Sequence, residues 1–175
     1  MSNKLRILGL DTSSQKVGWA VVGQGKERPV LVDHGLLVLQ KKLRHPARMC
    51  RFENFVKELI KTHDVHDVAI EDLKSIQNAK TVRILQNYIA AATLATWKML
   101  RRDAILIPQS TAHKRIGVKT LTPKEKKKLT KKEITEYNKK AVLTKVNRAF
   151  NLELGEQHYD VSDAITIGLA GLAGP

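Results

Sequence analysis

Cysteine is almost missing from this chain, because Cys50 is the only one among 175 residues. A single cysteine excludes an intramolecular disulfide and favours a reducing compartment such as the cytoplasm. Cys50 falls within an amphipathic pattern, so we expect it to pack in the interior, as free cysteines usually do. The first residues, Met1 to Lys4, lack the apolar core of a signal peptide, which also favours an intracellular protein.

Long apolar runs are missing as well. The longest mainly apolar stretches, near Tyr88–Leu100 and Ala164–Ala173, fall short of the roughly 20 residues that a membrane-spanning helix needs. We therefore expect no membrane partner. The length fits one folded domain covering residues 1–175, with enough chain for a substantial core.

Acidic residues are few compared with basic ones. The chain has 17 aspartates and glutamates against 31 lysines and arginines, which gives a net charge of +14. That excess is larger than solubility requires and indicates a polyanionic partner, of which nucleic acid is the usual one.

Most of the positive charge lies between residues 110 and 150, where 13 basic residues stand against three acids. Phosphate neutralisation is the functional interpretation, and a solvated helix face or a localisation signal is the alternative. Aromatic residues are absent from 124–132, so we expect contacts to phosphate there without base stacking. The residues that we predict to contact DNA are Lys74, Lys114, Arg115, Lys119, Lys124, Lys126, Lys127, Lys128, Lys131 and Lys132.

The hydrophobic pattern predicts a mixed α/β fold. A continuous apolar run predicts a buried strand at Leu5–Asp11, and alternating apolar residues predict a second at Lys16–Gly23. With a third strand at Val30–Leu39 and short turns between them, they form an antiparallel meander. Small residues in the second long helix would allow close packing, either in the core or across a dimer. The further predicted elements are helices at Pro46–Thr62, Asn78–Leu100, within Ser110–Gly117, within Lys131–Phe150 and at Tyr159–Leu172, with strands at Asp67–Glu71 and Ala104–Ile107.

Four acids stand at positions where a carboxylate is costly unless it meets water or a cation. Asp11 ends the first predicted strand and Glu71 ends the fourth, while Asp160 and Asp163 begin the last helix three residues apart. That spacing places the two aspartates on the same side of the helix. Asp11 and Glu71 would lie together if their strands are neighbours. Oxygen ligands of this kind suit Mg²⁺, and paired cations are a common device for cutting phosphodiesters.

Each acid has a simpler explanation when it is considered alone. Asp11 could form an Asx-turn, Glu71 could be surface charge beside Asp72, and the two helix aspartates could be first-turn or capping acids. A shared metal site explains the four together better than four separate roles. His113 and His158 are nearby ionisable residues, but we expect both to lie on the surface.

Three segments resemble the RuvC-type Holliday-junction resolvases in the correct order along most of the chain. They are residues 7–20 (ILGLDTSSQKVGWA), 68–71 (VAIE) and 160–168 (DVSDAITIG). The resemblance implies the RNase H-like fold of the retroviral-integrase superfamily, with a mixed five-stranded sheet flanked by helices. It also implies a homodimer formed through the helix at 78–100, and Mg²⁺-dependent paired nicking of four-way DNA junctions, with Mn²⁺ able to substitute. Asp11, Glu71, Asp160 and Asp163 carry over as catalytic metal ligands, and Lys114 as a catalytic basic residue near the scissile phosphate.

The chain departs from that family at several positions. Asp-Thr-Ser-Ser at 11–14 replaces the usual Asp-Pro-Gly-Ser, and Lys74 stands where an aromatic residue associated with base contacts at the crossover is expected. The lysine run at 124–132 is also unusually dense. Compact resolvases of phages and organelles show departures of this sort, so a viral origin with action in the host cytoplasm is one expectation. Other branched DNA, such as forks and flaps, joins four-way junctions as an expected substrate.

Three other functions are compatible with parts of the pattern. A ribonuclease acting on RNA–DNA hybrids would use the same acids, and a non-catalytic architectural DNA-binding protein would use only the basic segment. A phosphotransferase of the actin-like class is disfavoured, because the chain is short for two such domains and lacks glycine-rich nucleotide loops.

Overall fold

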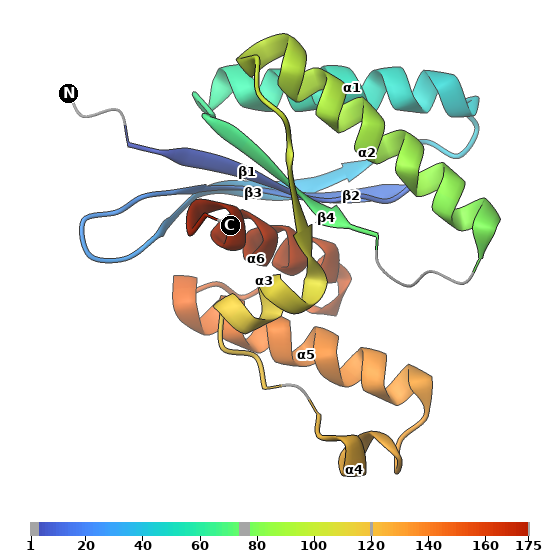
Figure 1. Cartoon of the computed structure of the whole chain (residues 1–175), viewed down its shortest axis with the longest axis vertical. Coiled ribbons are helices and arrows are strands. Elements are labelled where there is room, and N and C mark those ends of the chain that lie inside the picture. The colour runs from blue at the N-terminus through green and yellow to red at the C-terminus, as the bar shows by residue number, and fades with distance from the viewer. Residues whose placement is uncertain (1–3, 74–77, 120, 175) are drawn as a thin grey trace.

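A single five-stranded sheet forms the centre of the molecule, in the order β3-β2-β1-β4-β5 (Figure 1). The structure is a computed structural model that describes residues 4–73, 78–119 and 121–174. Strands β1 to β3 form an antiparallel meander, whereas β4 and β5 run parallel to β1. The strands are β1 (Arg6–Asp11), β2 (Lys16–Gly23), β3 (Val30–Val38), β4 (Asp67–Asp72) and β5 (Ile105–Pro108).

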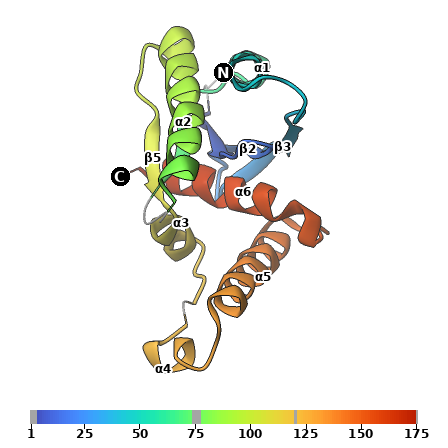
Figure 2. The same cartoon turned by 90° about the vertical axis from the view of Figure 1, so that its right-hand side faces the viewer.

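Helices cover both faces of this sheet. Two long helices lie on one face and α6 lies on the other, with α3 and α5 beyond it and α4 farthest from the sheet (Figures 1 and 2). The helical segments are α1 (His45–Thr62), α2 (Ala79–Leu100), α3 (Gln109–Arg115), α4 (Pro123–Lys126), α5 (Lys131–Phe150), the 3₁₀ turn η1 (Glu156–His158) and α6 (Tyr159–Leu172).

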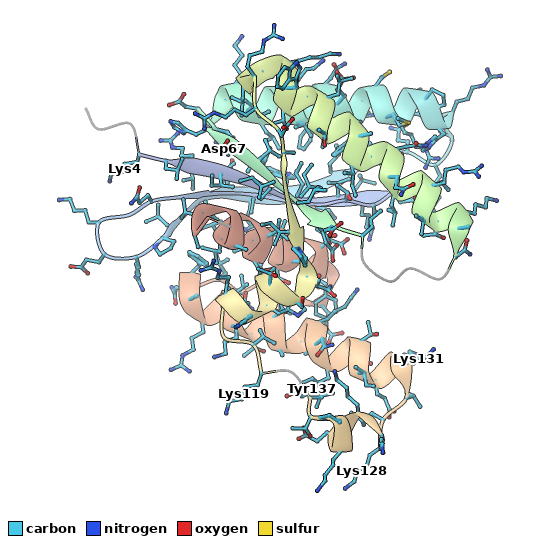
Figure 3. All side chains as sticks on the ribbon, viewed as in Figure 1. Lys4, Asp67, Lys119, Lys128, Lys131 and Tyr137 are labelled. Atoms are coloured by element: carbon cyan, nitrogen blue, oxygen red, sulfur yellow. The ribbon has the colours of Figure 1, made fainter. Side chains whose placement is uncertain are left out.

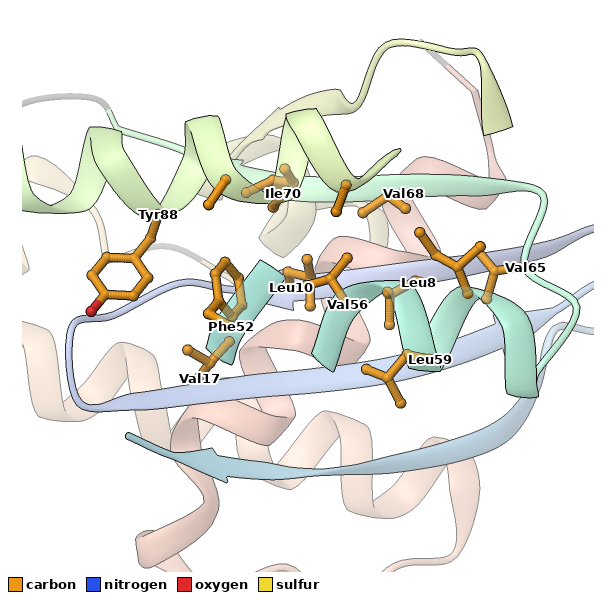
Figure 4. Packing of buried hydrophobic residues seen from close by; sticks show 14 of the residues in the cluster. Leu8, Leu10, Val17, Phe52, Val56, Leu59, Val65, Val68, Ile70 and Tyr88 are labelled. Atoms are coloured by element: carbon orange, nitrogen blue, oxygen red, sulfur yellow. The ribbon is translucent and has the colours of Figure 1, made fainter. Parts of the chain in front are cut away.

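Alternation along the strands divides the core into two layers. Leu8 and Leu10 of β1 point toward α1 and α2, where they join Phe52, Val56 and Tyr88 in the larger cluster (Figure 4). Residues on the opposite face of the same strands, among them Ile7 and Ala69, pack against α6 instead. Each fully buried aliphatic side chain contributes roughly 1.5–3 kcal/mol to the free energy of unfolding, so burial stabilises the packing on both faces of the sheet.

Glycine allows α6 to approach the sheet at backbone distance. A methyl group at Gly9 of β1 would overlap the backbone of Ala164 and Gly168, and one at Gly18 of β2 would overlap the carbonyl group of Asp160. Any larger residue at these positions would push the helix away. The contact fixes the start of α6 against the ends of β1 and β2.

The strands and long helices predicted from the sequence are confirmed, with ends that differ by one residue. The helix α4 was not predicted within the lysine run; Thr122 and Glu125 close its first turn by reciprocal side-chain hydrogen bonds. The expectation that Cys50 is buried is wrong, because it is exposed on α1. No helix in the described ranges is both long and apolar enough to cross a membrane.

Candidate active site

Asp11 and Glu71 are brought together by the parallel pairing of β1 and β4. Leu10 pairs with Ile70 in the register of these strands, so the next residue of each, Asp11 and Glu71, lies at the same edge of the sheet. Side chains alternate along a strand, which places both acids on the face that α6 covers. The sequence predicted that Asp11 and Glu71 lie together only if their strands are neighbours. The structure shows that β1 and β4 are neighbours.

The start of α6 supplies the other two acids. Asp11 pairs with Gly18 across the β1–β2 hairpin, and the backbone of Asp160 lies directly against Gly18. Asp163 follows one helical turn later and faces the same side. The negative charges of Asp163, Glu71 and Asp160 all act on Asp11, so the four carboxyl groups form one electrostatic cluster.

Charge on this cluster is strongly opposed by its surroundings. Burial, followed by the charges of the other three acids, raises the pKa of Asp11 well above its ordinary value. Burial also raises the pKa of Glu71, although a hydrogen bond with Asp11 opposes the rise. For Asp163, burial and then the charge of Glu71 raise the pKa to about 7.

One lysine faces the acids from a different element. The positive charge of Lys139, on α5, acts against the rise in the pKa of both Glu71 and Asp163. Its Nζ lies 5.4 Å from the centre of the Tyr159 ring, at the beginning of α6. The ammonium group of Lys139 therefore lies over an aromatic ring while its charge reaches two of the acids.

The acid cluster has the donor chemistry of a site for hard divalent cations. All four groups offer carboxylate oxygens, and a bound cation would offset the burial and mutual repulsion that raise the pKa values of Asp11 and Asp163. As the side chains lie, no three histidine, cysteine, aspartate or glutamate residues in the described ranges converge into one closed coordination shell. Mg²⁺ typically keeps several waters and takes only one or two carboxylates, so an incomplete protein shell fits this ion.

Lys114, predicted as a catalytic basic residue near the scissile phosphate, is exposed on α3. It lines a hollow of about 590 Å³ together with Ser110, Thr111 and Arg115. In the described part of the chain, the lysine whose charge lowers the pKa of Glu71 and Asp163 is Lys139. The role assigned to Lys114 stays a prediction.

Lys139 was missed because the sequence alone showed it as one basic residue among thirteen. A signal was available in the helical spacing: Val142 and Val146, three and seven residues farther along, are apolar and lie on the same side of α5. That stripe packs toward α6, so a lysine on the same side of α5 lies nearer to α6 than the other basic residues of the segment.

The other basic residues predicted to contact DNA lie on the surface around α3, α4 and the start of α5, away from the sheet (Figure 3). They are Arg115, Lys119, Lys124, Lys126, Lys127, Lys128, Lys131 and Lys132, all of them exposed. Lys74 lies outside the described residues. Of the two histidines expected on the surface, His113 is buried, which contradicts that expectation, and burial lowers its pKa.

Comparison with known proteins places this site in a family. The model of the family described as crossover junction endodeoxyribonuclease RuvC matches residues 7–171. The chain belongs to the RuvC family. The match covers β4 and all but one residue of β1 and of α6, so it includes all four acids, and the predicted family resemblance is confirmed.

Individual RuvC proteins are similar over different lengths. The crossover junction endodeoxyribonuclease RuvC of Campylobacter jejuni strain RM1221 is 26% identical over 171 residues, covering 97% of this chain and 95% of that protein. The RuvC of Caulobacter sp. strain K31 is 34% identical over 92 residues, or 52% of this chain and 54% of its own length.

Solved structures show the same fold at low sequence identity. Thermus thermophilus RuvC in complex with Holliday junction substrate has a TM-score of 0.74 at 13% identity and covers 97% of this chain and 96% of its own. The yeast mitochondrial Holliday junction resolvase Ydc2 has a TM-score of 0.61 at 12% identity, and the match covers 95% of this chain and 77% of that protein. The expected five-stranded, RNase H-like architecture is thus confirmed.

Proposed function

We propose that this chain is a structure-selective endonuclease that binds four-way and other branched DNA and cuts it by metal-dependent phosphodiester hydrolysis. The observation that carries the proposal is the cluster of four carboxyl groups and one lysine at the edge of the sheet, within a protein of net charge +14. Membership of the RuvC family supports the same activity.

Asp11, Glu71, Asp160 and Asp163 would hold the divalent cations, for which Mg²⁺ is our proposal and Mn²⁺ a substitute. The chemistry that such ions supply is the activation of water and the stabilisation of the leaving oxygen of a phosphodiester. The protein contributes a rigid frame, because β1, β4 and the start of α6 are locked together by strand pairing and by glycine contacts. A bound cation would balance the negative charge of the ionised acids, which burial otherwise makes unfavourable.

Lys139 would bind a non-bridging oxygen of the scissile phosphate. Its charge already acts on Glu71 and Asp163, and its Nζ lies 5.4 Å from the centre of the Tyr159 ring. A positive charge aimed at the phosphate stabilises the additional negative charge of the transition state. Lys139 would thereby orient the substrate as well as balance part of the charge of the four acids.

The basic surface around α3, α4 and α5 would hold the arms of the DNA. Its lysines offer point charges to phosphates, which fix the position of the substrate without reading its sequence. The resulting preference is for the shape of a branch rather than for a base sequence.

We also propose that two copies act together. Leu94 and Trp97 of α2 are each 47% exposed, and Leu106 of β5 is 49% exposed. An apolar surface of this kind on a long helix is suited to an isologous contact between identical chains. Two active sites related by a two-fold axis would nick opposite strands of one junction.

The proposal is tested on a labelled, immobile four-way junction, with linear duplex, a flap and an RNA–DNA hybrid as comparisons. Wild-type protein should introduce paired, ligatable nicks in opposite strands with Mg²⁺, and none with EDTA. Asp11→Asn and Glu71→Gln should lower the nicking rate by roughly a hundredfold or more, since each removes an anionic ligand worth several kcal/mol. Both variants should still bind the junction.

Glu153→Gln is the matched control, because it neutralises an exposed acid outside the cluster. It should cut as the wild type does, while Lys139→Ala should cut at least about tenfold more slowly through the loss of one charge-assisted contact. Normal nicking by both acid variants would show that the cluster is not the active site. Faster cutting of the RNA–DNA hybrid than of the four-way junction would identify a ribonuclease. Binding of the junction without any cutting would identify an architectural protein.

A further inference from the structure

A hollow separate from the acid cluster lies between the segment that follows α3 and the outer side of α5. Val118 and Lys119 form one wall, and Tyr137, Ala141 and Thr144 form the other. Its volume is about 340 Å³, within the range of roughly 300–1,000 Å³ that small-molecule sites occupy. The lining includes neither Lys139 nor any of the four acids, so this is a second place where a ligand fits.

The position of the hollow follows from the two sides of α5. Val142 and Val146 are buried and face the body of the protein. Tyr137, Ala141, Thr144 and Lys145 are spaced by four, three and one residues, which places them together on the opposite side. One helix therefore presents Lys139 to the acids and a separate surface to the hollow.

Tyr137 gives the hollow a flat aromatic wall. Its side chain is 44% exposed, although burial of an aromatic ring is strongly favoured, and it projects beside Lys119 in the lower part of the molecule (Figure 3). Val118 and Ala141 add apolar side chains to the two walls beside the ring. An exposed ring beside apolar side chains is the surface on which nucleobases stack.

Charge around the hollow is of one sign. Lys119, Lys140 and Lys145 line it, and no acid does so. Lys140 is bound to Glu136 and Glu156, at 3.0 and 3.3 Å, so its charge is already compensated. In the described ranges, Lys119 and Lys145 form no ion pair, which leaves two ammonium groups on the rim for an anionic ligand.

We propose that this hollow binds one unpaired nucleotide of the DNA substrate, with its base stacked on Tyr137 and its flanking phosphates held by Lys119 and Lys145. The inference rests on the proposed function, since it requires branched DNA as the substrate. Bases inside a duplex have both faces covered by neighbours, so only a base outside the helical stack can lie on the ring. Single-stranded segments at a branch or a flap provide such bases.

The first test measures binding of an oligothymidylate of roughly eight nucleotides, within the site sizes known for single-stranded DNA. Tyr137→Ala should lower its affinity about tenfold, whereas Tyr137→Phe, which keeps the ring, should bind as the wild type does. Affinity for a fully paired duplex should be the same in all three proteins. An oligothymidylate carrying 5-iodouracil, irradiated in the complex, should form its cross-link to Tyr137.

Lys145→Ala and Lys61→Ala form a matched pair, because both remove one exposed lysine but only Lys145 lines the hollow. Only Lys145→Ala should weaken oligothymidylate binding. Equal binding by Tyr137→Ala and the wild type, with cross-links elsewhere, would overturn this inference, while nicking of the junction by the wild type would leave the proposed function intact. Equal loss in Tyr137→Phe and Tyr137→Ala would also overturn it, because the hydroxyl rather than the ring would then be the contact.

Discussion

At the scale of single residues, Asp163 carries a charge that the fold opposes. Its pKa is raised to about 7 from an ordinary value of 3.8, through burial and the charge of Glu71. Between these two values the folded protein keeps a proton that the unfolded chain has released. The free energy of unfolding therefore falls as pH rises from about 4 to above 7, which is the reverse of a carboxylate held in an ion pair.

We therefore expect the metal-free protein to melt at a lower temperature at pH 8 than at pH 5. Asp163→Asn should reduce that difference by several degrees, given that 1 kcal/mol shifts Tm by roughly 2–4 °C in a chain of this size. Thermal unfolding followed by circular dichroism in EDTA measures this. Glu153→Gln is the control, since that acid is exposed. A wild-type Tm that rises between pH 5 and pH 8 in EDTA would contradict the expectation.

Residue types and their order predicted the acids but not the lysine that faces them. Asp11 and Glu71 could be recognised because an acid at the end of an apolar strand is costly wherever the strand lies. Lys139 could not be separated from its basic neighbours, because its role depends on how α5 packs against α6. Cys50 and His113 were misplaced for the same reason: their exposure depends on which side of a helix meets the protein.

At the scale of elements, the site depends on how closely α6 approaches β2. Gly18→Ala would place a methyl group in the carbonyl group of Asp160, so the start of the helix must move. Overpacking of this kind costs about 1–3 kcal/mol. We expect a reduced free energy of unfolding together with a large loss of nicking, because Asp160 and Asp163 move away from Asp11.

Gly23→Ala on the same strand is the matched control. The added methyl group there would lie 3.4 Å from Cγ2 of Val32, which is an ordinary contact. Urea unfolding and junction nicking should both stay close to the wild type in this variant. A Gly18→Ala protein that cuts at the normal rate would show that the position of α6 does not limit the reaction.

Local pattern predicted most elements because their periods are distinct. Strand β1 is a short run buried on both faces, β2 alternates around Val17, Trp19 and Val21, and α1 repeats its apolar residues at helical spacing. The pattern could not place β4 beside β1, since pairing of parallel strands is decided by packing of the whole sheet. It also missed α4, a single turn whose stability comes from a capping box rather than from a buried side.

At the scale of the whole molecule, positive charge is concentrated far from the acids. The turn of α4 and the residues around it lie at the opposite end from α1 and α2, beyond α5 (Figures 1 and 2). Separation of this kind keeps phosphate-binding lysines from pairing with the acids of the site. DNA arms would then be held at a distance from the scissile bond.

This arrangement predicts how binding responds to salt. Each lysine that neutralises a phosphate adds about −0.9 to the slope of log affinity against log salt concentration. Replacing Lys124, Lys126, Lys127 and Lys128 by glutamine should therefore make the slope shallower, by up to roughly one unit for each lysine that contacts DNA. Nicking of bound junction should continue at a near-normal rate, because these residues lie outside the acid cluster. Fluorescence anisotropy with a labelled junction across a salt series measures the slope.

The control removes the same charge from another surface. Lys26, Lys41, Lys42 and Lys61 are exposed and lie on α1 or in the connections between strands and helices. Their replacement by glutamine changes net charge by the same amount, so a long-range field acting through net charge alone would weaken binding equally in the two quadruple variants. A shallower slope only in the first variant would mean that the lysines around α4 touch phosphate. Equally shallower slopes in both would mean that net charge, not contact at α4, sets the response to salt, and an unchanged slope in both would mean that the arms of the DNA follow a different path across the protein.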